Sequence, residues 1–255
     1  MNVVVLAKYV PNPAGTPEMG PDNLLIREGV EGSLDPGDEP AIEAALEIIE
    51  KAGGEVTVVS MGPEPAMEAV RKALSVGAHK GVLVTDPALR GADTLVTATV
   101  LSSAIQLQEF DLVLTAVEST DGYSGTLPQT LAEFLGVPAL TFARKVEVND
   151  GTIRIERQTE NGYEVVEASP PALITVTAGA TTPRYPTLKG IMAAKQKPVE
   201  RYGIGDLGLT EDVVKATQTV SQVQPAPERQ AGEVVEDGEG VADRVVQLLK
   251  EAKVI

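Results

Sequence analysis

The chain contains no cysteine, no tryptophan and one histidine, and aromatic residues make up only 3% of its 255 positions. The absence of cysteine excludes disulfides, thiolate metal sites and cysteine nucleophiles. The single histidine, His79, has no second histidine or cysteine to join it, so no metal site is expected. His79 follows an apolar helical stretch and a glycine, and we expect it to cap a helix C-terminus rather than to act in catalysis.

Basic residues are also scarce, with 21 Lys and Arg against 37 Asp and Glu, and the formal net charge is −16. No nucleic-acid partner is expected, because a phosphate backbone needs a cationic surface. No apolar run approaches the length of a membrane span, and no basic-then-apolar leader precedes the first apolar run at residues 3–6. Together with the absence of cysteine, which suits a reducing compartment, these features predict a cytoplasmic protein.

The apolar residues, 43% of the chain, are mainly Val, Ile, Leu and Ala, a composition typical of a parallel sheet covered by helices. In the first half, short β-branched runs alternate with stretches of helical periodicity. Strands are predicted at residues 3–8, 56–60, 82–85 and 112–116, and helices at residues 39–51, 67–76, 92–107 and 127–135. This alternation predicts a Rossmann-like α/β fold, in which helices cover both faces of a mostly parallel sheet.

From residue 140 the pattern changes to the alternation of antiparallel strands, with turns at Asp150-Gly151 and Asn161-Gly162. Strands are predicted at residues 144–149, 152–158, 164–168 and 173–177, and they add a small antiparallel annex to the sheet. Residues 221–240 are rich in Gln, Glu, Pro and Gly and predict an extended C-terminal arm. Residues 241–253 predict an amphipathic helix that packs on the chain's own body or on a partner subunit.

Residues 183–201 contain five basic residues and one acid, although the chain as a whole is acidic. Pro183 and Pro186 stiffen the segment, and Leu188, Ile191 and Met192 then recur at the spacing of a short helix. The pattern alone supports two interpretations equally. The segment either offers a docking surface to an acidic partner or folds its Leu and Met back onto the chain's own core.

A loop rich in glycine and hydroxyl groups, VESTDGYSGTLP at residues 117–128, follows the fourth predicted strand. Ligands of open α/β sheets bind at the carboxyl ends of strands, and Gly122 and Gly125 allow close backbone approach. Pro128 suits the first turn of the next helix, whose free amides and dipole favour a phosphate. By composition alone, a strand-to-helix turn that binds nothing remains the better interpretation.

Other loops belong to the same edge of the sheet, where the strands have their carboxyl ends. They are residues 6–8 after the first strand, residues 34–38 before the first helix and residues 60–63 after the second strand. Small or apolar residues there would sandwich an adenine, with Asp35 and backbone groups recognising its polar edges. The chain has no Walker lysine motif and no Gly-x-Gly-x-x-Gly. A single phosphate therefore matches the loops better than a triphosphate with magnesium.

Along its whole length the chain resembles the β subunit of electron transfer flavoprotein. The motifs are VLAKYVP at 5–11, LDP at 34–36, SMGP at 60–63, RKALSVGA at 71–78 and, most specific, PRYPTLKGIMAAK at 183–195. The resemblance implies a nucleotide-binding α/β domain that pairs with a homologous α subunit carrying the redox-active FAD. In this family the β subunit commonly holds a structural AMP, and flavin-bifurcating members hold a second FAD there.

The resemblance also implies which residues contact the nucleotide. They are Leu6, Ala7, Lys8, Asp35, Pro36, Gly37, Asp38, Met61, Gly62, Ser119, Thr120, Asp121, Gly122, Tyr123, Ser124, Gly125, Thr126, Leu127, Gln129 and Thr130. The family's dehydrogenase-docking leucine matches Leu188, with Tyr185, Ile191 and Met192 beside it. No catalytic residue is implied. The loop departs from the family pattern, with DGYS in place of DGDT, which leaves AMP and a second FAD both open; we expect AMP.

We therefore expect an electron-carrier subunit rather than an enzyme, with flavin dehydrogenases such as acyl-CoA dehydrogenases as donors. Its acceptor would be an electron transfer flavoprotein–quinone oxidoreductase or a similar protein. Residues 1–182 would bind the nucleotide, residues 183–201 would dock the donor, and residues 202–255 would form an arm and helix on the α subunit. The alternatives are an ATP pyrophosphatase, although KYVPNP at residues 8–13 lacks a phosphate loop, and a universal-stress protein, which would need no arm.

Overall fold

The computed structural model describes residues 1–149, 151–224, 234, 238 and 240–255. The chain divides into two compact units, residues 1–221 and residues 222–255. The predicted turn residue Asp150 and much of the predicted arm lie outside the described residues. The predicted functional borders at 182 and 201 differ from this division and stay a prediction.

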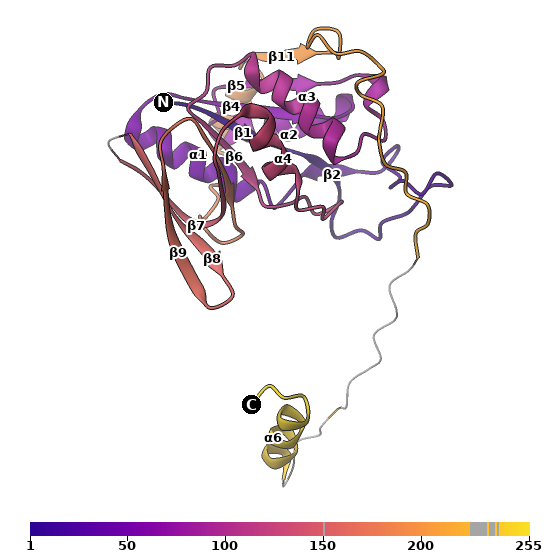
Figure 1. Ribbon diagram of the computed structural model, residues 1–255, viewed down its shortest axis with the longest axis vertical. Helices are drawn as coiled ribbons and strands as arrows, with labels where there is room; N and C mark the ends of the chain where they lie inside the picture. The colour runs from indigo at the N-terminus through magenta and orange to yellow at the C-terminus, as the bar shows by residue number, and fades with distance from the viewer. Residues whose placement is uncertain (150, 225–233, 235–237, 239) are drawn as a thin grey trace. The chain divides into compact units, whose positions relative to one another are not determined.

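A nine-stranded sheet lies at the centre of the first unit (Figure 1). Its strands are β1 (Asn2–Leu6), β4 (Glu55–Met61), β5 (Lys80–Val84), β6 (Leu112–Ala116), β7 (Ala139–Asn149), β8 (Thr152–Thr159), β9 (Gly162–Ala168), β10 (Ala172–Val176) and β11 (Val199–Tyr202). They lie in the order β11-β5-β4-β1-β6-β10-β7-β8-β9, and only the β7–β8 and β8–β9 pairs are antiparallel. The predicted α/β class and the mostly parallel sheet with an antiparallel annex are confirmed.

Helices cover both faces of the parallel part of the sheet. The helices of this unit are α1 (Glu39–Ala52), α2 (Met67–Val76), α3 (Thr94–Gln106), α4 (Leu127–Leu135) and α5 (Leu188–Ala194), with 3₁₀ turns η1 (Glu64–Ala66) and η2 (Pro87–Leu89). Along β1, Val3 and Val5 pack in one core with α1 and α2, whereas Val4 and Leu6 pack in the other with α3 and α4. Burial on both faces explains why the inner strands are almost continuously apolar.

Three short strands were not predicted. β2 (Tyr9–Pro11) and β3 (Gly32–Leu34) form a separate antiparallel pair, and β11 pairs in parallel with β5. Strands of three or four residues are too short to show a period, and their partners are distant in sequence. β7 begins at Ala139 rather than at residue 144, because its first part pairs in parallel with β10 before the antiparallel annex starts.

The capping role predicted for His79 is wrong. Its Nδ1 accepts a hydrogen bond from the backbone N–H of Val56 at 3.1 Å. The cation at the C-terminal end of α2 is Lys197, whose Nζ donates to the carbonyl oxygens of Leu74 and Ala78 at 2.8 and 2.6 Å. The basic residue that satisfies these carbonyls therefore comes from the segment predicted to dock a partner.

In the second unit, α6 (Val241–Glu251) confirms the predicted terminal helix. No residue of α6 is buried, and Val245, Val246 and Leu249 are exposed. The packing of α6 on a partner subunit stays a prediction. None of the helices in the described part of the chain is long and apolar enough to cross a membrane.

Candidate nucleotide site and docking surface

Strands β1 and β6 lie side by side in the sheet, with β4 beyond β1 and β10 beyond β6. The chain leaves β1 toward β4 and leaves β6 toward β7 and β10, so the two connections run in opposite directions. In open α/β sheets this topological switch point is where ligands bind, outside the carboxyl ends of the strands. The loops after β1 and β6 carry most of the predicted nucleotide contacts.

Asp35 joins the loop before α1 to the loop after β6. It is fully buried, and its carboxyl accepts hydrogen bonds from the Gly37 amide at 2.9 Å, the Thr120 amide at 2.7 Å and the Thr120 hydroxyl at 3.1 Å. Its own amide donates to the carbonyl oxygen of Lys8 at 2.9 Å. Asp35 therefore positions three loops, and both of its carboxyl oxygens already accept donors of the protein.

Lys8 connects the end of β1 to the loop after β6. Its Nζ donates to Asp121 Oδ1 at 2.7 Å and to Ser119 Oγ at 3.1 Å. The other carboxylate oxygen of Asp121 accepts a hydrogen bond from Arg27, a residue that the sequence did not single out. Burial opposes ionisation of Asp121, but the charges of Lys8 and then Arg27 hold its pKa below the ordinary value. Asp121 is therefore a carboxylate at neutral pH, neutralised by two cations.

Asp38 lies just before α1 and is 6% exposed. Its Oδ2 accepts a hydrogen bond from the backbone N–H of Lys8 at 2.7 Å. Burial raises the pKa of Asp38 to about 8, and the nearby charge of Asp35 acts in the same direction, whereas the hydrogen bond from Lys8 opposes both. The Asp38 carboxyl is therefore mostly protonated at neutral pH.

The N-terminus of α4 lies beside these loops and has polar groups without partners among the residues that the structure describes. Thr126 occupies the cap position without a side-chain capping bond, and Pro128 stands in the first turn. The Gln129 Oε1 atom is buried and has no hydrogen-bond partner in the part of the chain that the structure describes. Gly125, at φ +61°, turns the backbone into the helix. A helix start of this kind favours an anion.

The structure brings the predicted nucleotide residues to one edge of the sheet. Leu6 and Ala7 are buried at the end of β1, and Met61 and Gly62 are half-buried at the end of β4. In the loop after β6, Ser124 and Thr126 are exposed, and Tyr123 is 66% exposed. The remaining predicted residues on this edge are Pro36 and Gly37 before α1, Ser119, Thr120 and Gly122 after β6, and Leu127 and Thr130 on α4.

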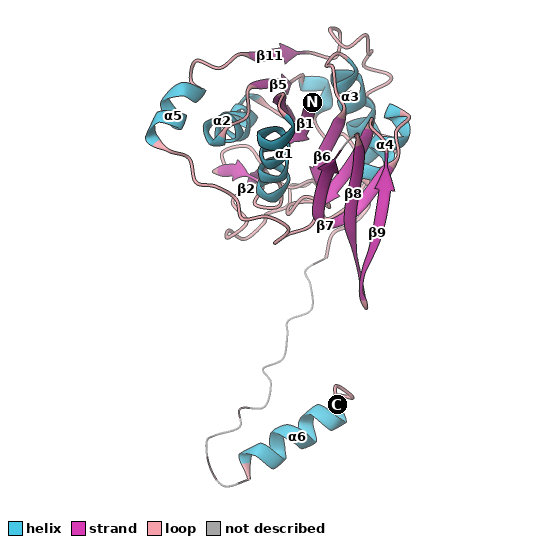
Figure 2. Cartoon of the chain, turned by 90° about the vertical axis from the view of Figure 1, so that its left-hand side faces the viewer, coloured by secondary structure: helices cyan, strands magenta, loops and turns pink. Residues whose placement is uncertain are grey.

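The predicted docking segment carries α5 on the side of α2 (Figure 2). Its apolar side chains face solvent, with Tyr185 91%, Leu188 79%, Met192 58% and Ile191 43% exposed. The alternative in which Leu188 and Met192 fold back onto the core is wrong. Two of the five basic residues counted in this segment, Arg184 and Lys197, bind groups of α1 and α2, so fewer cations remain for a partner than the sequence indicated.

The electron transfer flavoprotein domain model matches residues 22–228. The chain is 41% identical over 265 residues to the electron transfer flavoprotein subunit beta of Mycobacterium tuberculosis (strain ATCC 25618 / H37Rv), covering 100% of this chain and 99% of the relative. The chain belongs to the electron transfer flavoprotein family. Members of this family are electron carriers, so the chain is a carrier subunit rather than an enzyme.

Other members of the family are similarly close. The subunit beta of Thermoanaerobacterium thermosaccharolyticum is 40% identical over 242 residues, with 92% of each chain covered. The Caffeyl-CoA reductase-Etf complex subunit CarD of Acetobacterium woodii is 34% identical over 263 residues, with 100% of each chain covered. Membership of this family leaves the ATP-pyrophosphatase and universal-stress alternatives without support.

Proposed function

We propose that the chain is the β subunit of a heterodimeric electron transfer flavoprotein and that it binds one AMP at the sheet edge between β1 and β6. The observation that carries the AMP site is the convergence of the loops after β1 and β6 on the uncapped start of α4, where the Gln129 Oε1 atom has no partner among the described residues. FAD, held mainly by the α subunit, supplies the redox chemistry.

The residues at this edge fit a nucleotide with a single phosphate. Lys8 and Arg27 carry two positive charges against the one negative charge of Asp121, and Asp38 is mostly uncharged, so these four side chains together favour an anion. The free amides at the start of α4 would donate to one phosphate, and Gln129 Oε1 would accept from a hydroxyl or amino group of the ligand. Leu6 and Ala7 provide apolar contact for the base.

We assign the docking of donors to the exposed apolar surface formed by Tyr185, Leu188, Ile191 and Met192, here called the α5 surface. Its proposed donors are flavin dehydrogenases such as acyl-CoA dehydrogenases, and the proposed acceptor is an electron transfer flavoprotein–quinone oxidoreductase or a similar protein. We propose that the arm and α6 contact the α subunit, because no residue of α6 is buried within its own unit. We also propose that the complex acts in the cytoplasm.

The test is electron transfer by the purified complex of this chain with its α subunit. An acyl-CoA dehydrogenase reduced by its acyl-CoA should bleach the flavin absorbance of the complex, and added quinone oxidoreductase should restore it. The isolated chain, without the α subunit, should show no flavin absorbance. A colourless complex, or a complex that no flavin dehydrogenase reduces, would overturn the proposed function.

A further inference from the structure

Helix α5 is too short to be stable by itself, yet it presents a fixed apolar surface. It has seven residues, and Thr187 caps its start by accepting a hydrogen bond from the Gly190 amide at 3.0 Å. Helices of this length do not persist in water without tertiary contacts. Of its residues only Ala194 is buried, so its own burial contributes little. The contacts that flank α5 must therefore hold it in place.

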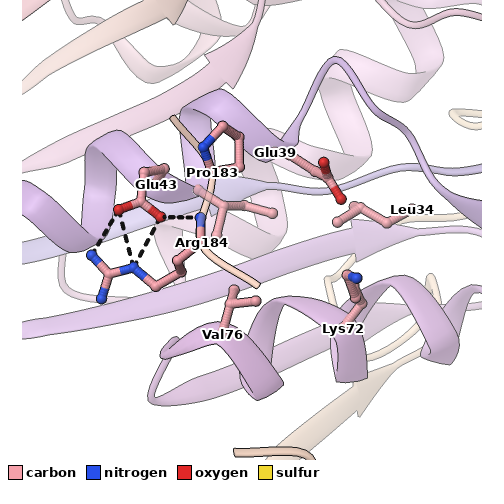
Figure 3. A pocket seen from close by; sticks show the side chains of 8 residues that line it. Leu34, Glu39, Glu43, Lys72, Val76, Pro183 and Arg184 are labelled. Atoms are coloured by element: carbon pink, nitrogen blue, oxygen red, sulfur yellow. Dashed lines mark hydrogen bonds and ion pairs between the residues drawn. The ribbon is translucent and has the colours of Figure 1, made fainter. Parts of the chain in front are cut away.

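Before α5, Arg184 fixes the chain to α1 (Figure 3). Its amide donates to Glu43 Oε2 at 3.0 Å, and its guanidinium donates to Glu43 Oε1 at 2.7 Å and to Glu50 Oε1 at 2.6 Å. The Glu43 side chain is 7% exposed, and hydrogen bonds from Arg184 lower the pKa of Glu50. A water-sized cavity of about 20 Å³ lies between α1 and α2 and is lined by Leu34 and Val76. Arg184 and Glu43 also line this cavity, so their ion pair lies at the contact between the two helices.

After α5, a reciprocal pair of basic side chains fixes the chain to α2. Lys197 Nζ donates to the carbonyl oxygens of Leu74 and Ala78 at the end of α2. In return, Arg71 of α2 donates to the carbonyl oxygens of Ala194 and Lys197, the latter at 3.0 Å. Each cation binds one carbonyl group in the last turn of a helix, at Leu74 or Ala194, and one carbonyl group just beyond that helix.

Within α5, Gly190 allows direct contact with α2. A Cβ atom added at Gly190 would lie 2.3 Å from the carbonyl oxygen of Ser75. The carbonyl oxygen of Ser75 and the Cα atom of Gly190 both belong to the backbone, so no flexible side chain could move aside to make room. Gly190 thus lowers the intrinsic stability of α5 but permits its close packing on α2.

We propose that Arg184, Gly190 and Lys197 are positioning residues that hold the α5 surface in its docking geometry before a donor arrives. This inference rests on the docking role proposed above. A surface that is already ordered loses less conformational entropy on association, so its affinity for a partner is higher. None of the three residues needs to touch the donor, and their effect reaches it through the placement of Leu188 and Met192.

The test uses the full complex of this chain with its α subunit and an acyl-CoA dehydrogenase reduced by its acyl-CoA. Arg184→Lys keeps the charge but loses the forked guanidinium, and Lys197→Met removes the bonds to the end of α2. Gly190→Ala raises the helix propensity of α5, so any loss that it causes comes from displacement of α5 from α2. Lys51→Met, an exposed lysine at the end of α1, is the control for a lost positive charge.

Each positioning variant should raise the KM of the dehydrogenase for the complex roughly tenfold and leave kcat of the dehydrogenase and the nucleotide content of the complex unchanged. Amide hydrogens of residues 188–194 should exchange faster than in the parent complex, and Lys51→Met should change neither quantity. Glu50→Gln removes the negative charge of one partner of Arg184, at the exposed edge of this ion pair, without leaving a buried charge. Glu50→Gln should also raise KM, by a smaller factor. It therefore tests the inference even if one of the three positioning variants fails to fold.

Leu188→Ala, measured in parallel, separates two failures. An unchanged KM for Leu188→Ala would overturn the docking role itself. A raised KM for Leu188→Ala, with KM and amide exchange unchanged in the positioning variants, would overturn the positioning inference and leave the docking role in place.

Discussion

Lys8 Nζ lies 2.7 Å from Asp121 Oδ1, and this ion pair joins two loops whose residues are 113 positions apart in the chain. The Asp121 side chain is 3% exposed, whereas that of Lys8 is 41% exposed. The carboxylate is therefore held in the protein while its cation reaches it from the solvent side. Arg27 completes the arrangement on the other carboxylate oxygen. The charge balance at the proposed AMP site depends on this group of three residues.

Replacing Lys8 by Met should lower AMP content and stability together. The variant leaves the nearly buried Asp121 with Arg27 alone, so the free energy of unfolding should fall by about 1–3 kcal/mol. Nucleotide released from the purified complex should contain less AMP and an unchanged amount of FAD. Lys51→Met, which removes an exposed lysine from α1, serves as the control. Full AMP content in Lys8→Met would contradict the proposed role of the pair.

Asp38 should make the stability of the protein depend on pH. Its folded pKa of about 8 lies above the ordinary value of 3.8, so the folded state binds more protons than the unfolded state between these pH values. The contribution of Asp38 to the free energy of unfolding is therefore fully present below about pH 4 and is lost as pH rises from there through 8.

Asp38→Asn removes the titrating group but keeps an oxygen atom that can accept the hydrogen bond from the Lys8 amide. Urea unfolding of both proteins from pH 5 to pH 9 should show the variant gaining stability relative to the parent as pH rises, with a plateau above pH 8. The exposed Asp212→Asn is the control. Parallel stability curves for Asp38→Asn and the parent would show that burial does not raise this pKa.

Leu188→Ala should impair docking of the donor and nothing else. Leu188 is 79% exposed, so its truncation leaves no cavity and should not change the melting temperature. As a central contact of the proposed interface, Leu188 should matter for docking, and the KM of a flavin dehydrogenase for the complex should rise about tenfold or more. Leu107→Ala, which truncates a 55% exposed leucine at the end of α3, should leave donor kinetics unchanged. Equal kinetics for the two variants would contradict the assignment of the α5 surface.

Removal of residues 222–255 should weaken assembly without unfolding the first unit. Residues 1–221 form a compact unit with both cores of the sheet, so the shortened chain should melt at the temperature of the full chain. Its yield in co-purification with the α subunit should fall sharply, because the proposed contacts of the arm and α6 are lost. Undiminished co-purification would show that the terminal unit is not needed for assembly.

The sequence was sufficient to predict β6 and α4, because each has a clear period and a clear boundary. β6 is buried at all five positions, and α4 begins beside Pro128 and ends before Gly136. β11 was missed, because its four residues are recognisable as a strand only through pairing with β5. A sequence pattern predicts a helix or strand when the residues that determine it lie within that element or directly beside it.

The sequence was sufficient to predict which loops lie together at one edge of the sheet, but not how their side chains bond to one another. The loops after β1 and β6 were singled out because they follow predicted parallel strands and because one of them is rich in glycine, whereas Arg27 lies in a stretch without periodicity and went unnoticed. Lys197 was counted as a cation for a partner, because its true acceptors are carbonyl oxygens more than a hundred residues away. Backbone acceptors leave no sequence signal, so such contacts appear only in three dimensions.

The central claim is that this chain holds AMP while its partner holds the flavin, and the nucleotide content of the heterodimer tests it most directly. The purified complex should be denatured by heat and its released nucleotides separated by chromatography and quantified against protein. One AMP and one FAD per heterodimer is the expected result. Two FAD molecules and no AMP, or FAD without any second nucleotide, would contradict it.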